Sequence, residues 1–118
     1  MTKTKTKKSK FPKTLTIKRS QWCRGNKKKY GDSALVNDKG FMCCLGFLGR
    51  ACGLTDNQML WVAEPTNFNN LFPVPASGNG WQEFMNINDS DAYSAADREQ
   101  DLKWLFKTEL GMKVRFVD

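Results

Sequence analysis

Three of the four cysteines lie in one apolar segment, GFMCCLGFLGRACGL, which spans residues 40–54. Thiolates bind zinc and act as nucleophiles, so this segment is the first candidate for chemistry. A four-thiolate zinc site would combine Cys23 with Cys43, Cys44 and Cys52. However, no two of them have the C-x-x-C spacing of zinc knuckles. We therefore expect no metal and no cofactor, and interpret the segment as a buried helix whose cysteines and glycines are small core residues.

The sequence contains no histidine. This excludes Ser-His-Asp and Cys-His catalysis as well as metal sites built on imidazole. There is also no P-loop, and GFLGRACG lacks the glycine spacing of a dinucleotide-binding fingerprint. We expect a protein that is not an enzyme and has no catalytic residues.

Basic and aromatic residues alternate in RSQWCRGNKKKY, residues 19–30. Arginine forks bind phosphates, and an aromatic face stacks on bases or on a partner's arginine. The candidates for binding a partner or nucleic acid are Arg19, Trp22, Arg24, Lys27, Lys28 and Lys29. In the alternative interpretation, Trp22 anchors this loop to the core while the basic side chains are solvated.

Five carboxylates precede or begin the last predicted helix, and they are Asp89, Asp91, Asp97, Glu99 and Asp101. Negative charge near a helix N-terminus is stabilising, which is a sufficient structural explanation. They are also a possible acidic docking face that imitates DNA phosphates for a DNA-binding partner. A weaker alternative is a metal-dependent nuclease that uses Asp89, Asp91 and Asp97.

Charge divides the chain unevenly. Residues 1–30 carry twelve Lys or Arg and no acid, a net charge of +12, whereas residues 31–118 carry seven basic and twelve acidic residues, a net charge of −5. Because residues 1–13 combine six lysines with few apolar residues, we expect a disordered basic tail, followed by a single domain over residues 14–118.

Periodicity indicates an α+β fold. Strands are predicted at residues 14–18, 33–37 and 112–118, a buried helix at 41–52, a short helix after Thr55, and a long helix between Ser94 and Gly111. Residues 65–80 predict an irregular surface loop. We expect a short antiparallel sheet that includes both terminal strands and packs on the Cys/Gly-rich helix and the C-terminal amphipathic helix.

Neither a membrane-spanning run nor a secretory signal is recognisable, so we expect a cytoplasmic protein that does not contact membranes. The aromatics of residues 61–84 are numerous for a loop-rich region, and any exposed ones would form a protein-docking surface. They are Trp61, Phe68, Phe72, Trp81 and Phe84.

Three motifs, which cover about half the chain, resemble small uncharacterised proteins of tailed bacteriophages. The motifs are I-x-R-S-x-W-x-R-G at residues 17–25, MCCLGF-x3-ACG at 42–53, and a helix over 97–110 followed by G-x-K-V-x-F-V-D. The resemblance implies an accessory protein in the host bacterial cytoplasm that binds and inhibits or modulates a host protein, as an anti-restriction-like factor acts in anti-defence. The alternative is nucleic-acid binding by the basic N-terminal third.

Overall fold

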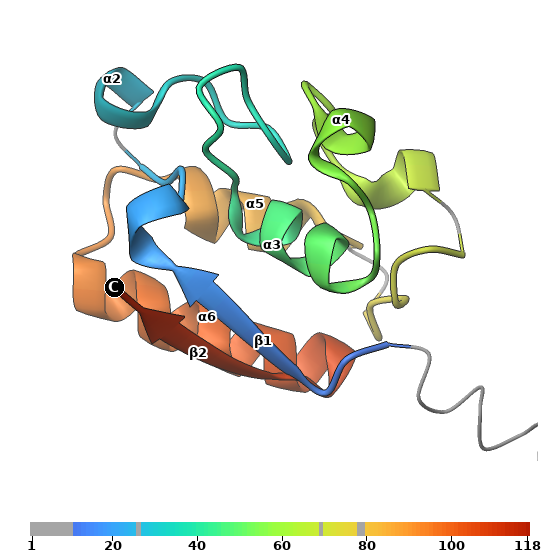
Figure 1. Cartoon of the computed structure of the whole chain (residues 1–118). Helices are drawn as coiled ribbons and strands as arrows, with labels where there is room; N and C mark the ends of the chain where they lie inside the picture. The colour runs from blue at the N-terminus through green and yellow to red at the C-terminus, as the bar shows by residue number, and fades with distance from the viewer. Residues whose placement is uncertain (1–10, 26, 69, 78–79) are drawn as a thin grey trace, which may run out of the picture.

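The computed structural model describes residues 11–25, 27–68, 70–77 and 80–118. The two strands lie side by side on one side of the molecule, with α6 packed against β2 and α3 against β1 (Figure 1). In chain order the elements are β1 (Thr14–Lys18), the 3-10 turn η1 (Arg19–Gln21), α2 (Lys27–Tyr30), α3 (Cys44–Ala51), α4 (Asp56–Met59), the 3-10 turn η2 (Pro65–Phe68), α5 (Gln82–Asp89), α6 (Ala95–Leu110) and β2 (Lys113–Val117).

The predicted α+β class is confirmed, and both terminal strands belong to one sheet. The predicted antiparallel pairing is wrong, because β1 and β2 are parallel, with Thr14 opposite Lys113 and Lys18 opposite Val117. Alternating apolar residues determine which face of a strand is buried, but they do not determine strand direction. The direction follows from the long connection through α2 to α6, which returns the chain to the same end of the sheet, as parallel pairing requires.

The Cys/Gly-rich segment forms a core helix, as predicted. Within α3, residues 44–49 are all buried. Two of these are glycines that allow neighbours to approach closely: a Cβ on Gly46 would lie 1.9 Å from the carbonyl oxygen of Leu35, and one on Gly49 would lie 2.4 Å from Sδ of Met59. The glycines therefore set how near α3 can lie to the rest of the core.

The long helix α6 is close to its prediction. The Ser94 hydroxyl accepts a hydrogen bond from the Asp97 amide at the N-cap, and Gly111 ends the helix in the left-handed region with φ 67°. The short helix α4 also begins at its predicted cap, where Thr55 and Gln58 form a capping box. Among the described helices, none is long and apolar enough to cross a membrane.

The strand predicted at residues 33–37 is wrong. Residues 34–37 are buried, but Val36 makes only an isolated bridge to Leu60. The amide of Leu35 donates to the carbonyl oxygen of Val62, and the amide of Trp61 donates to that of Val36. The apolar pattern was therefore correct for burial, but the neighbouring loop is too short and irregular to form a ladder.

Helix α5 was not predicted because its stabilising contacts come from elsewhere. Its N-cap residue Trp81 makes no side-chain cap. At the other end, the guanidinium of Arg98 donates to the carbonyl oxygens of Ile87, Asn88 and Ser90 at 2.6, 2.9 and 2.7 Å. A side chain of α6 thus binds the unpaired carbonyls that end α5.

We expect Gly46→Ala to lower the free energy of unfolding by about 2–3 kcal/mol, the usual cost of overpacking a core. The added methyl group would meet the backbone of Leu35, which cannot rotate away. Urea denaturation followed by circular dichroism measures the change.

The matched control is Ala51→Gly, at an exposed position of the same helix. It should cost about 1 kcal/mol, the ordinary difference in helix propensity. If Gly46→Ala is neutral or stabilising, the close approach of α3 to residue 35 is incorrect.

Candidate functional site

A hollow of about 410 Å³ gathers three of the predicted basic residues. We call it the basic groove, and it is lined by Arg19, Ser20, Arg24, Lys29, Tyr30, Phe41 and Asp118. It lies where η1, α2 and the end of β2 meet. The sequence prediction named Arg19, Arg24 and Lys29, whereas Tyr30 and Phe41, which pack edge to face at 5.5 Å, complete its wall.

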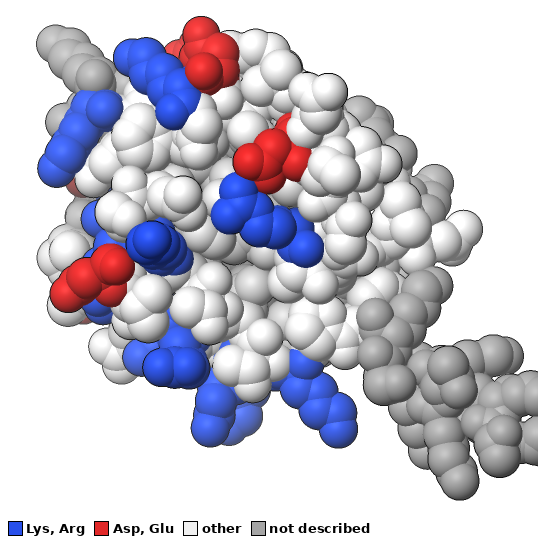
Figure 2. Space-filling model, in the orientation of Figure 1, with Lys and Arg blue, Asp and Glu red and all other residues white. Residues whose placement is uncertain are grey.

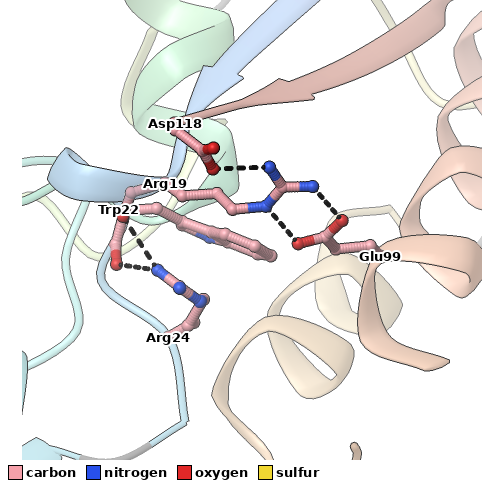
Figure 3. Close-up of polar contacts among 5 residues, drawn as sticks. All are labelled: Arg19, Trp22, Arg24, Glu99 and Asp118. Carbon is pink, nitrogen blue, oxygen red and sulfur yellow. Dashed lines mark hydrogen bonds and ion pairs between the residues drawn. The ribbon is translucent and has the colours of Figure 1, made fainter. Parts of the chain in front are cut away.

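Arg19 is held by two carboxylates from the C-terminal part of the chain (Figure 3). Its Nε and Nη2 donate to the two oxygens of Glu99, both at 2.8 Å, and Nη1 donates to Asp118 at 2.9 Å. The bonds to Glu99 and Asp118 raise the pKa of Arg19, and the bond from Arg19 lowers the pKa of Glu99. Arg19 therefore ties the end of β1 to α6, and its charge is largely balanced.

Arg24 presents the less compensated charge in the groove. Its guanidinium carbon lies 4.4 Å from the ring centroid of Trp22 and 5.1 Å from that of Tyr30. Nη1 donates to the carbonyl oxygens of Arg19 and Trp22 at 3.1 and 2.8 Å (Figure 3). No carboxylate among the described residues forms an ion pair with it. The aromatic contacts hold the guanidinium of Arg24 in place and leave it able to bind an anion.

Trp22 is a core residue, since only 1% of it is exposed. Its ring packs 5.0 Å from Phe116, and its indole N–H donates to Oδ1 of Asn88 at 2.8 Å. This arrangement agrees with the anchoring interpretation and leaves its ring unable to stack on a base. Trp22 contributes to the groove as a support beneath Arg24.

Asn88 fixes the loop that carries these residues. Its Oδ1 also accepts from the amide of Cys44 at 3.0 Å, while its Nδ2 donates to the carbonyl oxygen of Cys23 at 3.0 Å. The backbone carbonyl of Asn88 accepts from the amide of Gly25, again at 3.0 Å. The sequence analysis missed this residue, because a buried asparagine in a helix has no distinctive local pattern.

The three lysines of α2 are only partly described. Lys29 is exposed and its Nζ lies 5.4 Å from the ring of Tyr30. The side chains of Lys27 and Lys28 lie outside the part of the structure that is described, so their predicted role stays a prediction.

Parallel pairing of β1 and β2 extends the positive charge beyond the groove. We define the basic face as Lys18, Lys103, Lys107, Lys113 and Arg115, all exposed. Lys113 and Arg115 lie opposite Thr14 and Thr16 on the outer side of the sheet. Three of the lysines line a hollow of about 190 Å³ between α6 and β2. Blue side chains accordingly predominate where the strands and α6 lie (Figure 2).

The predicted acidic docking face is distributed over several places. Glu99 is paired with Arg19, and Asp89 accepts hydrogen bonds from Ser33 and from Asn88. Asp91 and Asp97 are exposed. Asp101 lines a separate groove between α5 and α6 with Glu83, Tyr93 and the exposed Trp104. Only Asp101 of the five lines that groove.

No disulfide joins the four cysteines to one another, and Cys23, Cys43 and Cys44 are buried. Desolvation raises the pKa of Cys43 to about 12 and also raises that of Cys44 and Cys52. These thiols stay protonated and weakly nucleophilic at neutral pH. Within the described ranges, no group of three or more Cys, Asp or Glu side chains is placed to hold a metal ion.

We expect the Arg19–Glu99 pair to stabilise the fold at pH 7, as a double-mutant cycle with Arg19→Gln and Glu99→Gln would measure. Because the pKa of Glu99 is lowered in the folded state, the unfolded state binds more protons in acid. The coupling should therefore be constant above the ordinary pKa of Glu99 and be lost as pH falls through the lowered pKa.

The control is the Arg50–Asp56 pair, whose side chains are 44% and 54% exposed. Its coupling should be smaller. Equal coupling in the two pairs, or a coupling for Arg19 and Glu99 that persists in strong acid, would contradict a stabilising role of the Arg19–Glu99 ion pair.

The chain matches no family model, no curated protein and no solved structure. The phage resemblance therefore stays a prediction, and function has to be argued from the geometry of this chain.

Proposed function

We propose that this protein binds nucleic acid, with the basic groove and the basic face holding the phosphate backbone. The observation that carries the proposal is the parallel pairing of the terminal strands. It places Lys18 on the same exposed side of the sheet as Lys113 and Arg115, with Lys18 opposite Val117, two residues along the ladder from Arg115. Lysine and arginine side chains spaced along one surface are the usual means of binding a phosphate backbone.

The carboxylates nearest this surface already have partners. Glu99 and Asp118 accept from Arg19, and Glu109 accepts from the amide of Ser77 at 2.7 Å. Among the described residues, no carboxylate forms an ion pair with the lysines or the arginine of the basic face. A polyanion that lies across the sheet would meet Lys18, Lys113 and Arg115 without having to displace an internal carboxylate from them.

The basic groove adds a site of different chemistry at the end of this surface. Arg24 is held there against aromatic rings, and Tyr30 and Phe41 are half-buried at the wall. An unpaired base can stack on an aromatic wall while the adjoining phosphate contacts a guanidinium. This combination favours single-stranded nucleic acid over duplex.

Residues 1–10 contain five further lysines but lie outside the described residues. The proposal therefore rests on the folded part of the chain. Its experiment must separate the contribution of the folded surface from that of the N-terminal segment.

A second candidate is binding of a host protein, as the phage resemblance implies. The observation in its favour is a set of exposed apolar side chains within residues 60–74, including Trp61 at 51% exposure. Phe72, Trp81 and Phe84 are buried, so Trp61 is the most exposed of the five aromatics singled out in the sequence. Stoichiometric capture of one bacterial protein from nuclease-treated extract would support this candidate, and its loss in Trp61→Ala would locate the contact.

The nucleic-acid proposal is tested on the full chain by titrating a labelled mixed-sequence DNA strand at several salt concentrations between about 50 and 200 mM. The variant is Lys18→Gln/Lys113→Gln/Arg115→Gln. Removal of three phosphate contacts should reduce the slope of log affinity against log salt by about 2, at roughly 0.7 per contact for single strands.

The control variant is Lys39→Gln/Arg50→Gln, which removes two exposed positive charges that lie away from the sheet. This control should change the slope much less. If the wild type does not bind, or if the sheet variant and the control behave alike, the basic face is not the nucleic-acid site. Arg24→Gln should weaken binding to single strands more than to duplex.

A further inference from the structure

The groove between α5 and α6 has the opposite chemistry from the basic groove. Its volume is about 470 Å³, and two carboxylates, Glu83 from α5 and Asp101 from α6, belong to its lining. No Lys or Arg side chain is among the residues that line it. The groove therefore concentrates negative potential in a protein whose formal net charge is +7.

Trp104 gives this groove an aromatic wall. It is 61% exposed, the highest value among the large aromatic side chains of the described residues. It lies one turn after Asp101 on α6, so the indole and the carboxylate are neighbours on the helix surface. Because more than half of the Trp104 side chain is exposed to solvent, it contributes little hydrophobic stabilisation to the core.

The polar part of the groove is supported by the fold. Burial raises the pKa of Tyr93, and the charge of Asp101 and a hydrogen bond to it act in the same direction. Tyr93 and Asp101 therefore lie against each other at one wall. The guanidinium of Arg98 lies 5.8 Å from the ring centroid of Tyr93, but it is 6% exposed, donates to the three carbonyls that end α5 and is not part of the lining of the groove.

We propose that this groove binds an arginine side chain presented by an extended segment of a partner protein. The guanidinium would stack on the indole of Trp104 and donate to the carboxylates of Asp101 and Glu83. Tryptophan is the strongest aromatic partner for a cation, and a planar guanidinium suits both stacking and forked hydrogen bonds to carboxylates. Complementary charge and an open aromatic wall identify this occupant.

The inference is independent of nucleic-acid binding, which uses a different part of the surface of α6. Lys103 and Lys107 line the hollow beside β2, whereas Asp101 and Trp104 line the groove beside α5. A single helix would thus separate a surface for phosphates from a surface for a basic peptide. Binding of a cationic peptide would also have to overcome the positive net charge of the protein, so any binding must come from local contacts.

The test titrates the full chain with a short synthetic peptide that alternates glycine and arginine, and follows the indole N–H signals by NMR. The comparison peptide replaces arginine with citrulline, which keeps the planar shape and removes the charge. We expect saturable binding of the arginine peptide that shifts the Trp104 signal. The citrulline peptide should bind with an affinity about tenfold lower or more, because a hydrogen bond from a charged donor is stronger than one from a neutral donor.

Trp104→Ala and Asp101→Asn should each lower the affinity for the arginine peptide about fivefold or more, as expected for loss of a hot-spot contact. The controls are Val74→Ala, which trims an exposed apolar side chain elsewhere, and Asp38→Asn, which removes an exposed charge in another turn. Both should bind like the wild type. Unchanged urea midpoints for all four variants would show that they fold.

The proposal is overturned if the wild type shows no saturable shift at Trp104, if citrulline binds as well as arginine, or if the Trp104 and Asp101 variants bind as the controls do. The same variants should keep wild-type affinity for the DNA strand. Loss of DNA binding in the variant of the basic face, with peptide binding retained, would show that the two surfaces act separately.

Discussion

A single buried amide, that of Asn88, connects the parts of this fold that carry the candidate groove. It is 1% exposed, and its side chain bonds to the indole of Trp22, the amide of Cys44 and the carbonyl oxygen of Cys23. One residue of α5 thus satisfies groups from the loop after β1 and from the first turn of α3. Buried polar groups without partners are costly, so these segments have one favourable arrangement around it. Arg24 is positioned as a consequence, because it packs on the indole that Asn88 holds.

Local patterns in the sequence were sufficient for the elements that local chemistry determines. Ser94 and Gly111 delimit α6, and Thr55 begins α4, because caps act within one turn of the helix that they end. The core position of the Cys/Gly-rich helix followed from its composition. By contrast, α5 depends on Arg98 from the next helix, and the parallel direction of the strands depends on the whole connection between them. Such contacts have no local signature.

The candidate sites likewise combine features that the local sequence indicates with features that only distant contacts determine. The basic residues of the N-terminal part were recognisable as a cluster, and Arg19, Arg24 and Lys29 do meet in one groove. Dividing the chain into a basic third and an acidic remainder concealed the contribution of residues 103–115. Within β2, Lys113 and Arg115 are exposed on the face that points away from the buried Val114. The sequence predicted both terminal strands in one sheet but not their parallel register, and it left open whether Trp22 is buried.

The parallel sheet also constrains how the chain reaches its native state. Its two strands are separated by residues 19–112, so the ladder forms only after a very long loop has closed. Non-local pairing of this kind slows folding relative to helical proteins. While the chain is being synthesised, β1 leaves the ribosome long before β2 exists, and Leu15 and Ile17 have no sheet partner during that interval. The nascent chain therefore carries an unpaired strand edge until β2, which follows the last helix, has emerged, and such edges favour aggregation during synthesis.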